Sequence, residues 1–318
     1  MYLHYNPFTY LKTEIDILRM VDILFETEKE ISQDPFFIPV EKTFLVSLIG
    51  YMHEELPKSE QNFNTLYMLI NKSISELDAL FGISNELFYK KAYETFKMGT
   101  SRIQESIKVT CSTMVDRIIR SSAKFKDDEI NFQDFRDKKT ILYINLDIYE
   151  NEYSLIVLLI SQLYNYLISD YVIGNEEDEI FNTMHKHSQP QSEMKYPVNF
   201  FIDEADNIGR IPDLNQIINT SSSYNIQFSI IAQSISDLEK CYNEKYENII
   251  NSFGSVLYFG GIIIERETLE YLNKYCETRL YTDMLPEEQC ILFIRGLKPI
   301  IDLKYNIIEH KRINEIEL

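Results

Sequence analysis

The residues best suited to chemistry are two neighbouring carboxylates and one amide in the second half of the chain. Asp203 and Glu204 close the apolar run at 198–203, and Gln233 follows a second apolar run at 226–232. In open sheets of alternating strands and helices, ligands bind beyond the carboxyl ends of the strands. If the two runs are neighbouring strands, the three polar side chains emerge beside one another.

Two carboxylates and an amide in this arrangement suit nucleotide hydrolysis. Asp203 is predicted to hold the water shell of a nucleotide-bound Mg²⁺, and Glu204 to polarise the attacking water, as in a Walker B motif. Gln233 is predicted to hydrogen-bond a γ-phosphate or to orient the water. Each residue also has a simpler alternative: acids after a strand can cap a helix, and Gln233 can cap the helix that follows it.

The second half of the chain has the pattern of an α/β domain. Short β-rich runs at 140–146, 198–203, 226–232 and 255–260 alternate with helical segments. Continuous apolar strands separated by helices predict a parallel sheet covered on both faces. A later run, CILFIRG, ends in Arg295 and Gly296 and is followed by Lys298. These three residues are candidates either for phosphate or partner contacts or for a surface β-turn.

Residues from 13 to about 125 instead show helical periodicity with little sign of strands. Thr13 and Asp16 have the spacing of a capping arrangement. The apolar residues that follow recur on one helical face: Ile17, Leu18, Val21, Leu24 and Phe25. This part of the chain is therefore predicted to be an all-helical module.

Composition argues against several functions. The 318 residues include 31 Lys and Arg against 50 Asp and Glu, a formal net charge of −19, so a general polyanion-binding surface is not expected. The four cysteines are scattered, which indicates neither zinc nor disulfides. The apolar segment 155–168 is too short for the roughly 20 residues of a membrane span.

Two basic strips suit either nucleic-acid contact or solvated helix faces. The first comprises Lys90, Lys91, Lys97, Arg102 and Lys108, and the second comprises Arg117, Arg120, Lys124 and Lys126.

Several runs resemble the TraG/TraD-type coupling ATPases of type IV secretion. Three of them, FFIDEADNIGRIPDLNQIINT, IQFSIIAQSISDLEKCY and FGSVLYFGG, resemble the core of that family. Others resemble segments on either side of it: YNPFTYLKTEIDIL, DPFFIPVEKTFLVSLIGYMHEE and CILFIRGLKPIIDLKY. The resemblance implies the α/β sheet of a RecA-like P-loop NTPase with an inserted all-helical domain. It divides the chain into a residual motor segment at 1–14, the helical domain at 15–135 and the carboxy-terminal motor part at 136–318.

The resemblance also implies a function. Such proteins are DNA-translocating ATPases that recruit relaxase and its single-stranded DNA to the channel proteins of a type IV secretion system, as homo-hexamers at the cytoplasmic face of the membrane. ATP and Mg²⁺ are the implied cofactors. Residue by residue, Asp203 and Glu204 match the Walker B pair, and Gln233 matches the glutamine that ends the next strand.

Two departures from the family pattern affect the nucleotide site. The motif G-x-x-x-x-G-K-[ST] is missing, since no Gly-Lys-Ser/Thr occurs among the 9 glycines, so we expect the chain to begin midway through the ancestral motor. Ser222 and Tyr224 stand where relatives carry arginines, one of them a candidate arginine finger. Arg210 is nearby but does not match the motif.

Three hypotheses follow from these observations. The chain is part of a motor whose P-loop lies on a separate or upstream polypeptide, and it is inactive alone; or it is a non-catalytic substrate-binding module; or it is a gene remnant. A sheet without its P-loop strand also exposes edges and apolar surface. We therefore expect poor solubility in isolation, or tight association with a partner.

Overall fold

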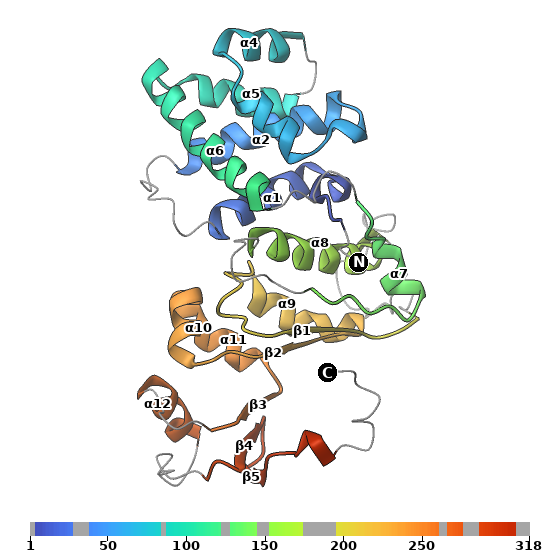
Figure 1. Cartoon of the computed structure of the whole chain (residues 1–318), viewed down its shortest axis with the longest axis vertical. Helices are drawn as coiled ribbons and strands as arrows, with labels where there is room; N and C mark the ends of the chain where they lie inside the picture. Colours follow the sequence, from blue (N-terminus) through green and yellow to red (C-terminus); the bar gives the residue numbers. More distant parts are fainter. Residues whose placement is uncertain are drawn as a thin grey trace, which may run out of the picture. The chain divides into compact units, whose positions relative to one another are not determined.

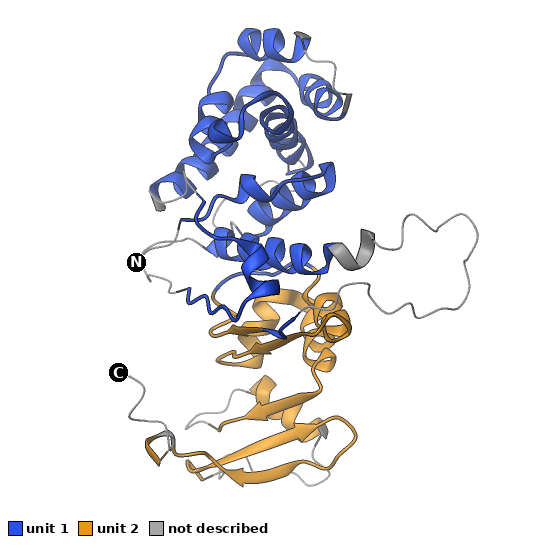
Figure 2. Ribbon diagram, turned by 90° about the vertical axis from the view of Figure 1, so that its right-hand side faces the viewer, with its two compact units in different colours: residues 1–198, 208–212 blue, residues 199–207, 213–318 orange. Residues whose placement is uncertain are grey.

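The computed structural model describes residues 4–27, 38–83, 87–121, 128–144, 153–173, 195–260, 266–275 and 286–309. The chain divides into two compact units, which Figure 2 colours separately. Unit 1 comprises residues 1–198 and 208–212, and unit 2 comprises residues 199–207 and 213–318.

Unit 1 is built from helices (Figure 1). They are η1 (Pro7–Tyr10), α1 (Glu14–Thr27), α2 (Ile38–Glu55), η2 (Lys58–Glu60), α3 (Phe63–Ile70), α4 (Ile74–Ile83), α5 (Leu87–Lys97), α6 (Ser101–Ser121), α7 (Phe132–Asp137) and α8 (Tyr153–Ile173). The helical prediction is confirmed, because the described residues between 14 and 121 form no strand. The cap is confirmed too: Thr13 Oγ1 accepts the Asp16 N–H at 3.3 Å, and Asp16 Oδ2 accepts the Thr13 N–H at 2.9 Å.

Helix α2 lies at the centre of unit 1 and packs against α1, α3, α5 and α6. Its apolar side chains are buried: Phe44, Leu45, Leu48, Ile49 and Met52. Gly50 lets α5 approach closely, because a Cβ at this position would lie 2.6 Å from the Cβ of Tyr89. The rings of Phe44 and Phe96 stack across the same pair of helices with centroids 4.2 Å apart.

Helix α8 uses a polar side chain to hold the start of the chain. The Tyr5 hydroxyl donates to Gln162 Oε1 at 2.5 Å, and Gln162 Nε2 donates to the Pro7 carbonyl at 3.0 Å. The Asn6 N–H donates to Asp128 Oδ1 at 3.3 Å, and burial raises the pKa of that carboxyl.

No helix formed by the described residues is long and apolar enough to cross a membrane.

Unit 2 contains two small sheets. Its elements are β1 (Val198–Ile202, with Val198 in unit 1), α9 (Leu214–Ser221), η3 (Ser222–Tyr224), β2 (Ile226–Ile230), α10 (Ile235–Tyr242), η4 (Asn243–Lys245), α11 (Tyr246–Ser252), β3 (Ser255–Tyr258), α12 (Arg266–Tyr275), β4 (Gln289–Ile294), β5 (Ile300–Leu303) and η6 (Ile307–Glu309). Strands β1 and β2 form one sheet, and the other has the order β3-β4-β5. In the second sheet Val256 lies opposite Phe293, and Ile291 opposite Ile301.

The prediction of one parallel sheet is wrong for the strands after β2. Both β3 and β5 pair antiparallel with β4. A short turn joins β4 to β5, with Gly296 at φ +83° and the Leu297 N–H donating to the Ile294 carbonyl at 3.0 Å. Strands joined by so short a turn pair antiparallel, whereas parallel neighbours need a long crossover.

The strand expected at 140–146 is not confirmed either. Residues 140–144 have no regular secondary structure, and 145–146 lie outside the described residues. The side chains of Ile141 and Tyr143 are exposed. An apolar run becomes a strand only where another strand accepts its backbone hydrogen bonds.

Candidate functional site

Strands β1 and β2 lie side by side (Figure 1). Ile231, directly after β2, donates its N–H to the Ile202 carbonyl at 2.8 Å, and its carbonyl accepts the Ala205 N–H at 2.9 Å. In a parallel pair, a residue donates its N–H to one position of the neighbouring strand and accepts an N–H from a different position, as Ile231 does here. The residues that follow β1 and those that follow β2 therefore emerge at the same end of this sheet.

The strand pair has one buried and one open face. On the buried face the rings of Phe200 and Phe228 stack with centroids 4.7 Å apart, and Ile202 is buried. On the other face Phe201 is 78% exposed and Ile231 is 58% exposed. The buried face fixes the ends of the strands, while two large apolar side chains remain open to solvent.

Asp203 and Glu204 form a turn rather than the start of a helix. Asp203 Oδ1 accepts the Glu204 N–H at 3.0 Å, and the Asn207 side chain donates to Glu204 Oε2 at 3.0 Å. Helix α9 begins only at Leu214, so the alternative that these acids cap a helix is wrong. Glu204 has φ +49°, a left-handed conformation that costs free energy in a residue with a Cβ. Both carboxylates are exposed.

Gln233 is tied to the same turn through its backbone. Its N–H donates to Asp206 Oδ1 at 3.4 Å. Gln233 does not cap α10, because the cap is Ser234, whose Oγ accepts the Asp237 N–H at 3.1 Å and donates to Asp237 Oδ2 at 2.6 Å. Hydrogen bonds from Lys240 and Ser234 hold the pKa of Asp237 below its ordinary value. Among the described residues, no hydrogen bond joins the Gln233 side-chain amide to either carboxylate of the turn.

The sequence reasoning missed Asp206, Asn207 and the Ser234 cap. Signals for all three exist in the sequence. Asp and Asn side chains favour turns by bonding to nearby backbone, and a serine followed three residues later by an acid is close to the pattern of a capping box.

The candidates Arg295 and Gly296 lie in a turn directly after β4, which agrees with the alternative interpretation of this segment as a surface turn. The Arg295 guanidinium donates to the carbonyls of Asn251 and Phe253, the latter at 3.1 Å, and so stabilises the end of α11. Gly296 supplies the left-handed conformation of the turn.

The structure also places Arg210 and the two positions, 222 and 224, where relatives carry arginines. Arg210 lies in unit 1, where its Nε is 3.6 Å from Glu26 Oε2. Ser222 and Tyr224 form η3, directly before β2. The Arg210 guanidinium is thus paired with an acid of unit 1.

Acids pair with some residues of the two basic strips. Three of their members face a carboxylate: Lys97 with Asp78 at 2.6 Å, Lys108 with Glu105 at 3.8 Å and Arg120 with Asp116 at 2.8 Å. Lys124 and Lys126 lie outside the described residues. For the described part of the strips, these pairs favour solvated helix faces over a nucleic-acid surface.

One segment of the chain matches a protein-family model. Residues 197–283 match a family model described as the TraM recognition site of TraD and TraG. No protein among the curated sequences matches the chain.

Solved structures are similar over almost the whole chain. The bacterial conjugative coupling protein TrwBdeltaN70 in its unbound form has a TM-score of 0.68 at 11% identity, and the alignment covers 95% of this chain and 72% of that one. Plasmid coupling protein TrwB in complex with ADP and Mg²⁺ has a TM-score of 0.65 at 14% identity, with the same coverage. TrwB with the GTP analogue GDPNP has a TM-score of 0.64 at 12% identity, covering 95% of this chain and 71% of that one. The family match relates residues 197–283 to the TraM recognition site of TraD and TraG, and the solved structures show that the chain shares the fold of the coupling protein TrwB.

Proposed function

We propose that this chain serves conjugative DNA transfer as a coupling-protein subunit that recruits relaxase and its single-stranded DNA to the secretion channel. The observation that carries the proposal is the meeting of Asp203, Glu204 and Gln233 at one end of the β1–β2 sheet, in a chain with the fold of TrwB. The match at residues 197–283 supports docking of a TraM-type partner on this part of the chain.

In this proposal the chain supplies the carboxylate half of a nucleotide site in a RecA-like motor. Asp203 binds the water shell of Mg²⁺, Glu204 polarises the attacking water, and Gln233 orients the water or a phosphate. No three His, Cys, Asp or Glu side chains gather as metal ligands in the part of the chain that the structure describes. The exposed Asp203 carboxylate still fits Mg²⁺, which keeps several waters and takes its other ligands from substrate phosphates.

A second polypeptide segment, bearing the P-loop, completes the site. The sequence has no Gly-Lys-Ser/Thr of its own, so the phosphates need another source of backbone amides and a lysine. The open face of β1 and β2 supports such a segment, since Phe201 and Ile231 expose apolar surface beside the candidate site. A two-stranded sheet is also marginal without further strands or packing.

The test compares transfer frequency from donor cells that carry Asp203→Asn, Glu204→Gln or Asp213→Asn. Loss of a general base or of the Mg²⁺-binding carboxylate should lower transfer by about 10²- to 10⁴-fold. Asp213→Asn is the matched control, because Asp213 is also an exposed acid in a left-handed conformation, at φ +52°, but lies outside the turn. Co-purification of relaxase with each variant is measured in parallel.

The second candidate is a non-catalytic substrate-binding module, which the missing P-loop motif favours. It predicts that relaxase capture and transfer both stay at the parental level in the Asp203 and Glu204 variants. If the variants still capture relaxase but lose transfer, the result supports the motor role. Unchanged transfer in both variants rules out the motor role.

A further inference from the structure

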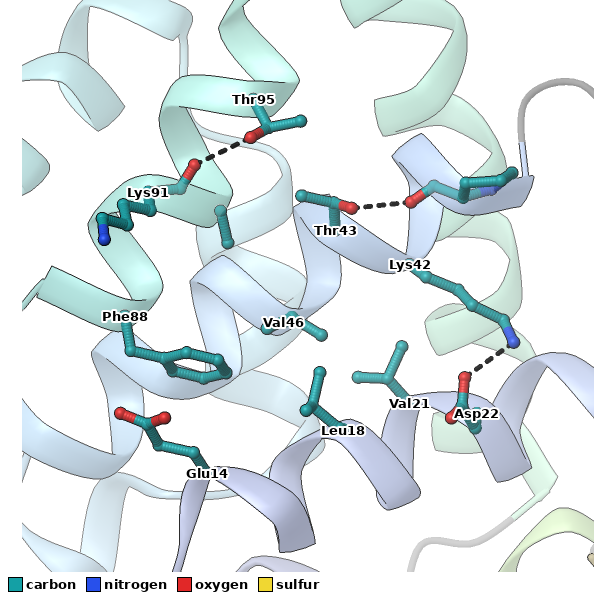
Figure 3. Close-up of a pocket in the computed structure, with 12 residues that line it drawn as sticks. Glu14, Leu18, Val21, Asp22, Lys42, Thr43, Val46, Phe88, Lys91 and Thr95 are labelled. Atoms are coloured by element: carbon teal, nitrogen blue, oxygen red, sulfur yellow. Dashed lines mark hydrogen bonds and ion pairs between the residues drawn. The ribbon is translucent and has the colours of Figure 1, made fainter.

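A groove in unit 1 runs between α1 and α5 across α2 (Figure 3). It encloses about 610 Å³, within the size range of pockets that bury ligands. Its apolar lining comes from all three helices: Leu18 and Val21 from α1, Pro39 and Val46 from α2, and Phe88 and Ala92 from α5.

The interior of the groove offers few hydrogen bonds. Val21 and Val46 are buried, whereas Leu18 stands 43% exposed. The Thr43 and Thr95 hydroxyls each donate to the carbonyl four residues earlier on their own helix, at 2.7 and 3.0 Å. With those protons engaged, the threonines contribute mainly their methyl groups. The groove therefore favours aliphatic side chains over a polar ligand.

The rim carries charges of both signs. At one end Lys42 Nζ lies 2.7 Å from Asp22 Oδ1 (Figure 3). Glu14 on α1 and Lys91 on α5 stand exposed on opposite walls, and neither pairs with another of the described residues. An occupant can therefore gain one contact to an acid and one to a base across its width.

We propose that this groove docks an amphipathic helix of a partner protein, with aliphatic anchors on Leu18, Val21 and Val46. A basic side chain on one flank of that helix meets Glu14, and an acidic one on the other flank meets Lys91. Helices bind such grooves through anchors spaced at i, i+3 or i+4, and i+7. The chain's net charge of −19 favours a partner helix that is positive overall. The groove lies in unit 1 and its role is independent of the nucleotide chemistry proposed for Asp203.

The probe is a fluorescein-labelled helical peptide with leucines at the anchor positions and basic residues on its outer face. Three versions differ only in the two flanking positions: one Arg and one Glu, both Arg, or both Glu. Fluorescence anisotropy with the full chain should show saturable binding that is tightest for the mixed peptide. Leu18→Ser should weaken it about tenfold, because it removes most of one aliphatic contact.

Charge reversal on one wall gives the sharper test. Lys91→Glu makes both walls acidic and should shift the preference to the peptide with two arginines by about threefold. Glu14→Lys should shift it to the peptide with two glutamates. Met68→Ser on α3 is the matched control, since Met68 is 61% exposed outside the groove and should leave binding unchanged.

Three results would overturn the proposal. They are the lack of saturable binding by the mixed peptide, equal binding to the Leu18→Ser variant, and an unchanged charge preference in both reversal variants. Urea midpoints equal to those of the parent show that the variants are folded.

Discussion

Replacing Gly50 by alanine should force apart α2 and α5, two of the helices that line the groove. An ideal Cβ at Gly50 lies 2.6 Å from Tyr89 Cβ and 3.4 Å from Tyr89 Cγ. Carbon atoms in favourable contact are about 3.5–4.0 Å apart, so α5 must shift by about 1 Å. Turning the Tyr89 side chain cannot relieve the contact, because the atom at 2.6 Å is its Cβ, which moves only with the backbone. The ring is also buried, and its hydroxyl donates to Glu55 Oε1 at 2.6 Å.

The free energy of unfolding should fall by up to about 2 kcal/mol. Overpacking a close contact costs about 1–3 kcal/mol, and the higher helix propensity of alanine offsets about 1 kcal/mol of that cost. Because 2.6 Å is shorter than real Cβ contacts, the cost should lie at the upper end of the range.

Equilibrium unfolding in urea, followed by circular dichroism, measures the change. Gly82→Ala on α4 is the matched control, since its new Cβ meets no atom within 4 Å. This variant should be at least as stable as the parent, because alanine has the higher helix propensity. A Gly50→Ala protein as stable as the parent, or more stable, would refute the close-approach argument.

Three further predictions concern single side chains. Glu41 is buried with Oε2 unpaired, and burial raises the pKa of this carboxyl above its ordinary value. Because the folded-state pKa is the higher one, the contribution of Glu41 to stability is fully present below the unfolded-state pKa. It is lost as pH rises through the folded-state pKa. Glu41→Met should therefore stabilise by about 1–3 kcal/mol in urea unfolding at pH 8 but not near pH 4, while Glu94→Met, at an exposed site, should change little. Ser234→Ala removes the α10 cap and should lower the urea midpoint by an amount equivalent to about 1 kcal/mol. Glu204→Gly should relieve the left-handed strain and raise stability by up to about 1 kcal/mol while transfer frequency falls; lower stability would contradict the strain assignment.

Much of the local structure follows from the sequence. Helical periodicity between 13 and 125 predicts helices there, and the cap at Thr13 and Asp16 follows from residue types alone. The strands at 198–202 and 226–230 follow from their apolar runs, and the neighbourhood of Asp203 and Gln233 follows once those strands pair in parallel. The expected domain limits at 15–135 and 136–318 stay a prediction.

The remaining features depend on contacts between distant segments. The sequence pattern of β3 does not reveal that its neighbour runs antiparallel, because apolar alternation marks a strand but not its partner. The carbonyl partners of Arg295 and the acid beside Arg210 lie far from these arginines in the sequence.

Sequence by itself therefore determined the types of most elements, the polar residues that end β1 and β2, and the lack of a P-loop motif. Tertiary structure decided which strands pair, which charges are neutralised and where α1, α2 and α5 enclose a groove. The physical reason is range: periodicity and capping act within a few residues, whereas sheet pairing and groove shape arise only when distant segments pack together.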